Sequence, residues 1–267
     1  MDRKKVGCIG TGVMGSALME SVIQVTGASE VLVYDADALK AEAFCLKNGC
    51  VKASSNREVA SGAYFVFLAV KPQYLSSVLE EIAPSLSDDT VLVSMAAGVK
   101  IELIRKHLDG HPKIIRIMPN TPAAVGSAII AIAPDQAVLP SETQELQRLL
   151  APAGLTELTG EPLMDAVTAV SGSGPAYGYL FIEALSDAAV MMGMPRMQAT
   201  RYAAQTLKGA AEMVLQTGTH PGALKDSVCS PAGTTIAAVA KLEEKGFRTA
   251  IIQAALAAWD RSRELGK

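Results

Sequence analysis

The sequence predicts an α/β domain built on a mostly parallel sheet, followed by an all-helical domain. Short apolar runs alternate with helical runs over the first half of the chain, and the run at residues 64–70 is apolar throughout, as in a strand that is covered on both faces. A glycine-rich turn from Gly10 to Gly15 links the first apolar run to the first helical one. From Pro162 onward the pattern is almost entirely helical and rich in Ala, Gly and Met.

The glycine-rich turn has the spacing of a dinucleotide-binding site. Gly10, Gly12 and Gly15 follow an apolar strand at residues 6–9 and open a helix. The first glycine allows the tight turn, the second lets a pyrophosphate approach the backbone, and the third lets the helix pack on the strand. Asp35 ends the next strand, about 20 residues further on, where an acid binds ribose hydroxyls. We therefore expect a Rossmann-type domain rather than a glycine-rich turn that binds nothing.

The other elements of the first half follow from apolar runs and the turn residues between them. The expected strands cover residues 6–9, 31–34, a short stretch near Val51, and residues 64–70, 90–95, 113–118 and 128–133, with helices at residues 38–47 and 56–60. The carboxyl ends of parallel strands share one rim, so we expect the cofactor there. The residues at these ends are small or form turns, as in Lys71-Pro72, Ala96-Ala97-Gly98 and Pro119-Asn120.

The alternation of strands and helices stops around residues 151–161. We therefore expect a dinucleotide-binding domain at residues 1–158 and a helical domain at residues 159–267. The expected helices of the second domain cover residues 174–193, 195–217, 221–228, 234–245 and 248–265. Their broad faces of small apolar residues are typical of a subunit interface, so we expect a homodimer formed through this domain.

The composition excludes several other classes of protein. The net charge is −3 and no basic run is longer than Arg3-Lys4-Lys5, so we expect no nucleic-acid partner. The apolar segment at residues 176–194 contains Glu183 and Asp187, so we expect no membrane span. The amino-terminal residues have no signal-peptide pattern, which favours a cytoplasmic location. The four cysteines and three histidines lack metal-ligand spacing, so we expect no metal.

Residues 229–236 place a glycine and two threonines at the start of a helix. The free N–H groups at Gly233, Thr234 and Thr235 and the positive end of the helix dipole favour a carboxylate, so an anionic substrate would bind there. A threonine hydroxyl would then lie beside another polar atom of that substrate. An ordinary capped helix explains the same residues, and the spacing leaves both interpretations open.

Several motifs along the whole chain resemble the pyrroline-5-carboxylate reductase family. They are, in the family's order, Val70-Lys71-Pro72, Ala96-Ala97-Gly98, Met118-Pro119-Asn120-Thr121-Pro122, Ser171-Gly172-Ser173-Gly174-Pro175-Ala176-Tyr177, His220-Pro221-Gly222-Ala223-Leu224-Lys225-Asp226 and the segment from Ser230 to Thr235. The resemblance implies the last step of proline synthesis, in which a nicotinamide cofactor gives hydride to the C=N carbon of 1-pyrroline-5-carboxylate. It also implies a homodimer and, as in related enzymes, a larger ring of dimers.

The resemblance further implies the roles of individual residues. Thr235 matches the catalytic threonine that lies beside the ring nitrogen. The substrate carboxylate is held by the segment that matches Ser230, Gly233, Thr234 and Thr235, and the acid that matches Glu161 is associated with proline binding. With the turn and rim positions above, the expected cofactor-binding residues are Ile9, Gly10, Thr11, Gly12, Val13, Met14, Asp35, Asn56, Ala69, Val70, Lys71, Pro72, Met95, Ala96, Ala97 and Asn120.

The chain departs from the usual family pattern at two positions, and a third residue, Asp35, bears on the choice of cofactor. Ala232 stands where a glycine is usual, so the substrate loop loses backbone freedom. Ser227 stands where the family often has an asparagine that contacts the cofactor. Many members favour NADPH, but Asp35 would repel a 2′-phosphate, and no arginine lies nearby in the sequence to bind one. We therefore expect NADH to be used at least as well as NADPH.

Two other functions remain open at this point. A β-hydroxyacid dehydrogenase also joins a dinucleotide-binding half to a helical half. That family has a catalytic lysine in the helix after its glycine-serine motif, whereas residues 176–194 of this chain contain no lysine. A dinucleotide-binding sensor without turnover is not excluded by any residue. Oxidation of the cofactor that depends on added pyrroline-5-carboxylate would distinguish the enzyme from the sensor.

Overall fold

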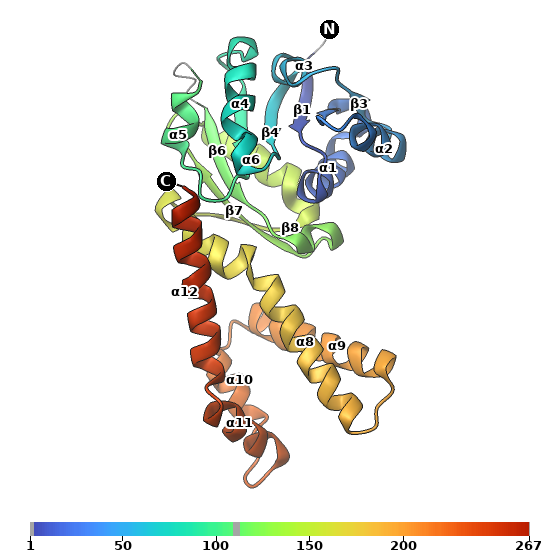
Figure 1. Cartoon of the computed structure of the whole chain (residues 1–267), viewed down its shortest axis with the longest axis vertical. Coiled ribbons are helices and arrows are strands. Elements are labelled where there is room, and N and C mark those ends of the chain that lie inside the picture. The colour runs from blue at the N-terminus through green and yellow to red at the C-terminus, as the bar shows by residue number, and fades with distance from the viewer. Residues whose placement is uncertain (1–2, 109–112, 267) are drawn as a thin grey trace. The chain divides into compact units, whose positions relative to one another are not determined.

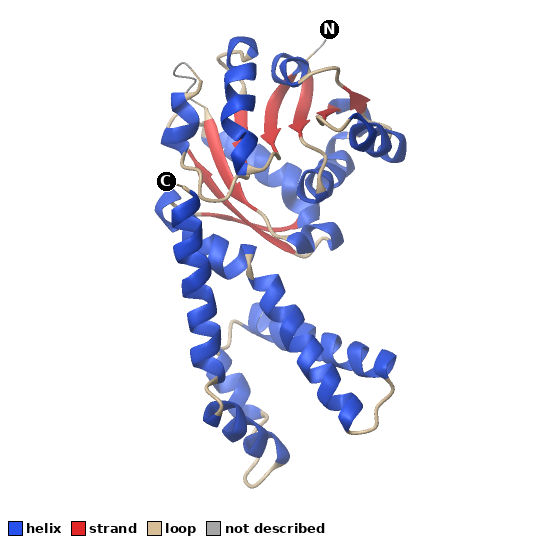
Figure 2. Cartoon of the chain, in the orientation of Figure 1, coloured by secondary structure: helices blue, strands red, loops and turns tan. Residues whose placement is uncertain are grey.

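The computed structural model describes residues 3–108 and 113–266 and divides into two compact units (Figure 1). The first unit contains Met1–Gly172 and Ala258–Lys267, and the second contains Ser173–Ala257. The sheet belongs to the first unit, whereas the second unit is helical (Figure 2). The predicted fold class is confirmed. The predicted boundary after residue 158 lies before the division at Gly172, and it assigns residues 258–267 to the helical domain. It stays a prediction about functional domains.

Within the described residues, eight strands form one sheet in the order β3-β2-β1-β4-β5-β6-β7-β8. The strands are β1 (Lys4–Ile9), β2 (Val31–Tyr34), β3 (Val51–Lys52), β4 (Ala63–Leu68), β5 (Val91–Ser94), β6 (Ile114–Met118), β7 (Ala128–Pro134) and β8 (Gly154–Leu158). Strands β1 to β6 are parallel, β7 is antiparallel to β6, and β8 is parallel to β7. Each strand predicted from the sequence is confirmed, with small shifts at its ends.

The last two strands correct part of the prediction. Because β7 is antiparallel to β6, its carboxyl end lies at the opposite edge of the sheet from the rim that β1, β4, β5 and β6 share. The connection from β6 to β7 contains only a short 3₁₀ helix at Thr121–Val125, and a parallel strand would need a much longer crossover. The sequence does not predict β8, because this edge strand is half-exposed and has no continuous apolar run.

Helices cover both faces of the sheet. They are α1 (Val13–Thr26), α2 (Ala38–Asn48), α3 (Asn56–Gly62), α4 (Pro72–Ile82), α5 (Ile101–Lys106) and α6 (Pro140–Leu150). Phe65 and Phe67 of β4 pack in one buried cluster with side chains of α1, α2 and α6. Val66 and Leu68 pack in the other cluster with side chains of α3, α4 and α5. Successive residues of β4 thus face different clusters, which explains the unbroken apolar run of this strand.

The second unit has little apolar core of its own. Its helices are α8 (Gly174–Met191), α9 (Arg196–Thr217), α10 (Pro221–Ser227), α11 (Thr234–Glu244) and the first part of α12 (Phe247–Leu265). The five helices predicted for this half of the chain are confirmed, with small shifts at their ends. Within residues 173–257, all of which the structure describes, Ala199 and Ala203 are the only buried apolar residues. Large apolar side chains such as Leu180, which is 65% exposed, instead face outward.

Neither a membrane-spanning helix nor a metal cluster is present in the part of the chain that the structure describes. No helix there is both long enough and apolar enough to cross a bilayer. The same residues contain no group of three or more His, Cys, Asp or Glu side chains that could hold a metal ion. The expected cytoplasmic location stays a prediction.

Candidate active site

The glycine-rich turn between β1 and α1 contains glycines with different roles. Gly10 has φ +102°, and a Cβ there would lie 2.6 Å from the Ala69 carbonyl oxygen. A Cβ on Gly15 would lie 2.2 Å from the Gly10 carbonyl oxygen. A Cβ on Gly12 would have no neighbour within 4 Å among the described residues. Packing therefore requires Gly10 and Gly15, whereas Gly12 leaves the backbone open to an approaching phosphate.

The start of α1 is suited to bind an anion. Gly12 is the N-cap residue and has no side chain to accept hydrogen bonds from the first turn. The first turn contains no acidic residue, and Val13 is 78% exposed. Free N–H groups and the positive end of the helix dipole thus face outward at Gly12 and Val13, as a bound pyrophosphate requires.

Asp35 is held in place at the end of β2. Its Oδ2 accepts hydrogen bonds from the Thr11 N–H at 2.7 Å and from the Thr11 hydroxyl at 3.2 Å. Its Oδ1 accepts a hydrogen bond from the Asp37 N–H at 2.9 Å. These bonds fix the half-buried carboxylate beside the glycine-rich turn. This is the position from which an acid binds the ribose hydroxyls of an adenosine.

Two further segments join this rim because β1, β4 and β5 are neighbours in the sheet. The Ala69 N–H donates to the Ile9 carbonyl at 2.8 Å, and this places residues 69–72 beside the glycine-rich turn. Met95, after β5, donates its N–H to the Leu68 carbonyl at 3.5 Å. Residues 95–97 therefore lie beside the end of β4. Three segments that the sequence predicts as cofactor-binding thus lie side by side at one edge of the sheet.

The Gly12→Ala variant is expected to weaken nucleotide binding at least tenfold, while the free energy of unfolding changes by less than about 1 kcal/mol. The added methyl group meets no protein atom but occupies the path of the phosphate. Isothermal titration with nucleotide and thermal denaturation measure the two effects. The matched variant Gly15→Ala is expected to unfold more easily, because its methyl group meets the Gly10 carbonyl oxygen. Unchanged nucleotide affinity in Gly12→Ala would contradict this assignment.

The predicted substrate segment lies in the second unit, at the start of α11. Gly233 is the N-cap residue of this helix, and no side chain makes a cap hydrogen bond there. The interpretation as an ordinary side-chain-capped helix therefore loses its main support. A Cβ on Gly233 would lie 2.3 Å from the Ser230 Oγ, so a side chain at this position would require the Ser230 hydroxyl to move. The expectation of a free N–H at Gly233 is wrong, because this N–H donates to the Ser230 carbonyl at 3.0 Å and closes the turn before the helix. The first N–H groups of α11 itself, from Thr234 onward, remain free to bind a carboxylate.

Ala232 adopts an unusual backbone conformation in the same loop. Its φ is +56°, and in the described chain no other residue except glycine has a positive φ. A left-handed conformation costs an alanine about 1–2 kcal/mol relative to the right-handed one. The loop thus keeps a glycine-like conformation despite the alanine, and the turn that leads into α11 is retained.

The half-buried Glu161 forms an ion pair with a buried arginine in the first unit. Its Oε1 accepts hydrogen bonds from the Arg116 guanidinium at 2.9 Å and from the Ile101 N–H at 2.7 Å. The Arg116 side chain is only 6% exposed, and that of Glu161 is 30% exposed. The Ile101 N–H is the first of α5, so the carboxylate also interacts with the start of this helix. Glu161 therefore holds together β6, α5 and the residues that follow β8.

Comparisons with known proteins identify the family. Residues 161–265 match the family model described as pyrroline-5-carboxylate reductase dimerisation. Residues 5–98 match the model described as NADP oxidoreductase coenzyme F420-dependent. The pyrroline-5-carboxylate reductase of Escherichia coli (strain K12) is 46% identical over 267 residues, which cover 99% of each chain. The chain belongs to the pyrroline-5-carboxylate reductase family.

Other members of the pyrroline-5-carboxylate reductase family are similar over the same length. The Pisum sativum pyrroline-5-carboxylate reductase is 40% identical and covers 99% of this chain and 97% of its own. The Plasmodium falciparum pyrroline carboxylate reductase, solved with NADP bound, has a TM-score of 0.90 at 32% identity and full coverage of both chains. A Mycobacterium tuberculosis 3-hydroxyisobutyrate dehydrogenase has a TM-score of 0.53 at 14% identity, covering 82% of this chain and 72% of its own, and shares only the fold.

Two predicted cofactor residues of this pyrroline-5-carboxylate reductase family member also make internal hydrogen bonds. Asn56 donates from Nδ2 to the Glu81 carboxylate at 2.7 Å. The buried Asn120 donates to the Ser171 carbonyl at 3.0 Å and accepts from the Ile129 N–H at 3.2 Å. The side-chain amide of Asn120 thus links the end of β6 to the π-helical turn at Thr168–Gly172. Their contacts with a nucleotide stay predictions.

Arg116 is the residue near the site that sequence reasoning missed. It interrupts the apolar strand Ile114–Met118, and a charged residue in the middle of such a strand requires a partner in the fold. That signal is present in the sequence, but it does not identify Glu161 as the partner. The remaining predicted residues divide between the units: the cofactor-binding segments and Glu161 belong to the first, and Ser230, Gly233, Thr234 and Thr235 belong to the second.

Proposed function

We propose that the chain reduces 1-pyrroline-5-carboxylate to proline with a reduced nicotinamide nucleotide, as the last step of proline biosynthesis. The observation that carries this proposal is the full-length similarity to curated pyrroline-5-carboxylate reductases, which spans both units. The glycine-rich rim and the uncapped start of α11 supply the two binding functions that the reaction needs. The nicotinamide, when bound, supplies the hydride, and no protein nucleophile is required.

The residues of the rim fit a dinucleotide. The open backbone at Gly12 and the free N–H groups of Val13 and Met14 would bind the pyrophosphate. Asp35 would bind the adenosine ribose. The other proposed contacts are those of the sequence prediction: Ile9, Gly10, Thr11, Asn56, Ala69, Val70, Lys71, Pro72, Met95, Ala96, Ala97 and Asn120.

The start of α11 would hold the substrate by its carboxylate. We assign this contact to the N–H groups of Thr234 and Thr235, with the Ser230 hydroxyl beside them. The Gly233 N–H donates to the Ser230 carbonyl at 3.0 Å, so Gly233 is assigned to the site through its backbone position and not as a donor. The Thr235 hydroxyl has no hydrogen-bond partner within the described residues, so it remains available to the ring nitrogen. A protonated, positively charged imine accepts hydride more readily, so a hydrogen-bond acceptor beside this nitrogen assists the reaction. Glu161 is assigned to the substrate side through the resemblance.

A turnover assay tests the proposed function. The absorbance of the reduced nicotinamide is expected to fall only when pyrroline-5-carboxylate, nucleotide and protein are all present. Proline is expected to form in equal amount. Nucleotide binding without any such turnover would favour the sensor, and turnover with a small 3-hydroxy acid and oxidised nucleotide in place of the imine would favour the β-hydroxyacid dehydrogenase.

NADH is proposed to serve at least as well as NADPH. The fixed carboxylate of Asp35 would accept a hydrogen bond from a 2′-hydroxyl and repel a 2′-phosphate. The Asp35→Asn variant is expected to raise kcat/KM for NADPH relative to NADH by about tenfold, because it removes this repulsion. Steady-state kinetics with both nucleotides measure the ratio. A wild-type kcat/KM for NADPH tenfold above that for NADH would contradict the proposal.

The second unit is proposed to form a homodimer, and its function as a dimerisation domain is what the matched family model describes. An apolar groove of about 700 Å³ lies between α8, α11 and α12, lined by Leu180, Phe181, Leu242 and Ile251 among others. An apolar groove on helices with exposed large apolar side chains is typical of a subunit interface. A ring of such dimers and the domain boundary after residue 158 remain part of the same proposal.

Light scattering tests the dimer. The wild-type chain is expected to have at least twice the monomer mass at micromolar concentration. The Leu180→Asp variant is expected to lose the dimer mass, because the dimer would bury a charge in the groove. Gln205→Asp on the exposed side of α9 is the matched control and is expected to keep the wild-type mass. A stable wild-type monomer would contradict the proposed assembly.

A further inference from the structure

The loop after β5 packs directly against the end of the chain's last helix. Gly98 is buried with φ +76°, and a Cβ there would lie 2.7 Å from the Ser262 carbonyl oxygen and 3.1 Å from the Gly266 nitrogen. A Cβ on Gly266 would lie 2.2 Å from the Gly98 carbonyl oxygen. The two backbones therefore touch without any side chain between them. All of these residues belong to the first unit.

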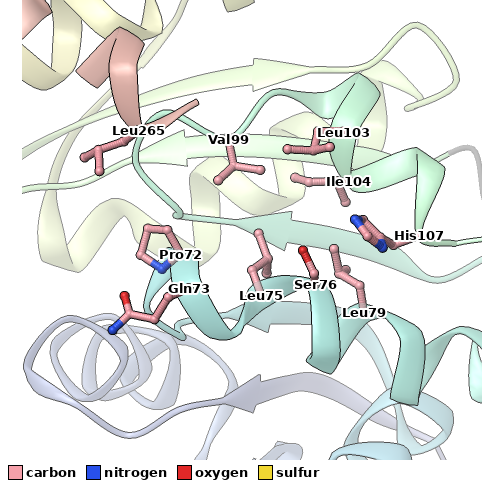
Figure 3. Close-up of a pocket in the computed structure, with 10 residues that line it drawn as sticks. All are labelled: Pro72, Gln73, Leu75, Ser76, Leu79, Val99, Leu103, Ile104, His107 and Leu265. Atoms are coloured by element: carbon pink, nitrogen blue, oxygen red, sulfur yellow. The ribbon is translucent and has the colours of Figure 1, made fainter. Parts of the chain in front are cut away.

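The end of α12 is itself anchored. Ser262 is 2% exposed, and its hydroxyl donates to the Asp165 carboxylate at 2.7 Å. Leu265 lines a pocket of about 420 Å³ together with Pro72 and Val99 (Figure 3). Pro72 ends one proposed cofactor segment, and Val99 follows the other closely. The last turn of α12 thus borders both segments.

The loop at residues 95–100 has few strong hydrogen bonds of its own. The Ala96 N–H donates to the Ser94 hydroxyl at 3.4 Å, and the Val99 N–H donates to the Ala96 carbonyl at 3.4 Å. Both distances exceed the roughly 2.7–3.2 Å that is usual for N–H···O bonds, so both bonds are weak. The conformation of the loop must therefore depend on its neighbours. One of these neighbours is the end of α12, which leaves no room for a side chain at Gly98.

We propose that the last turn of α12, residues 262–266, is a positioning element for the nucleotide. It holds residues 95–97 in the conformation that binds the nicotinamide side of the cofactor, and Gly98 and Gly266 are the positioning residues. This inference rests on the proposed function, because the contact of residues 95–97 with a nucleotide is part of that proposal. The helix α12 begins in the second unit and ends in the first. Its last turn contacts the loop at residues 95–100, and its first part belongs to the helical unit.

A fluorescent side chain, that of Trp259, lies on the same helix as the contact between Gly98 and the end of α12. Trp259 is the only tryptophan of the sequence and lies on α12, one turn before Ser262 and Arg263. The Arg263 guanidinium lies over the Trp259 ring, 4.7 Å from its centroid. The emission of Trp259 therefore reports on the last turns of α12. Binding of NADH, NADPH or their oxidised forms is expected to change this emission in the wild-type protein.

The test compares nucleotide affinity among glycine variants of the full-length chain. Gly98→Ala and Gly266→Ala are expected to raise the nucleotide Kd about tenfold or more and to reduce the Trp259 response, because both displace the loop. The KM for pyrroline-5-carboxylate is expected to change less than twofold. Gly266→Ala needs no left-handed backbone, so it remains informative if Gly98→Ala does not fold. Gly246→Ala is the control: Gly246 has φ +74° but no neighbour within 4 Å of its Cβ among the described residues.

The outcomes separate this inference from the proposed function. Folded Gly98→Ala and Gly266→Ala proteins with wild-type Kd values would overturn the inference, even if their thermal stability were lower. An equal rise of Kd in Gly246→Ala would overturn it as well, since that residue has no contact with the loop. If the wild-type chain bound neither nucleotide, the proposed function would fail, and the inference with it. Wild-type binding with a selective loss in the first two variants supports both.

Discussion

Replacement of Thr235 by valine is expected to lower kcat/KM for pyrroline-5-carboxylate by about 10²-fold, which corresponds to ~2.7 kcal/mol of transition-state stabilisation. Valine keeps the shape of the side chain and removes only the hydroxyl. That hydroxyl makes no hydrogen bond within the described protein, so its loss leaves no internal group unsatisfied. The effect is therefore expected on the reaction and not on folding. Steady-state kinetics and thermal denaturation of the purified variant measure the two.

The conservative variant separates the hydroxyl from other effects at this position. Thr235→Ser keeps an oxygen at the start of α11 and is expected to retain most of the wild-type kcat/KM. Both variants are expected to bind nucleotide with wild-type Kd, because the rim belongs to the first unit. If Thr235→Val kept the wild-type kcat/KM, the role assigned to this hydroxyl beside the ring nitrogen would be wrong.

Removal of the Glu161 carboxylate is expected to destabilise the first unit by about 3 kcal/mol. The Glu161→Ala variant leaves the Arg116 guanidinium, whose side chain is 6% exposed, without this counter-charge. It also removes the acceptor for the first N–H of α5. Because α5 follows directly after residues 95–100, the same variant is expected to weaken nucleotide binding. Urea denaturation gives the free energy of unfolding, and titration calorimetry gives the Kd.

A double variant tests whether the buried charge causes this loss. Arg116→Met combined with Glu161→Ala removes both charges and is expected to recover more than half of the lost stability. Glu157→Ala, on the exposed part of β8, is the matched control and is expected to change stability by less than about 0.5 kcal/mol. A loss below about 1 kcal/mol in Glu161→Ala would show that the pair contributes little.

The first half of the fold could be predicted because its signals are local. The strand at 6–9, the glycine spacing and Asp35 lie within a short segment, and an unbroken apolar run such as β4 identifies a strand that is covered on both faces. The direction of β7 depends instead on the length of the turn before it. The strand β8 pairs at the sheet edge, where little burial is needed, so it has no strong apolar pattern.

Contacts between distant residues could not be predicted. Arg116 and Glu161 are 45 residues apart, and no local pattern pairs them. Gly98 resembles an ordinary turn glycine in the sequence, yet its tightest neighbours belong to the end of α12. The residues at the start of α11 carry a local signal, a glycine and two threonines at a helix start. Their chemical role came from the family resemblance and not from spacing.

The most direct test of the proposed chemistry is a crystal structure of the protein with proline and oxidised nucleotide bound together. We expect the proline carboxylate within hydrogen-bond distance of the N–H groups of Thr234 and Thr235, next to Gly233, with the ring nitrogen beside the Thr235 hydroxyl. We expect the pyrophosphate at Gly12 and the nicotinamide near enough to the proline ring for hydride transfer, about 3–3.5 Å between reacting atoms. Proline bound away from the start of α11, or a nucleotide bound away from the glycine-rich turn, would contradict the account.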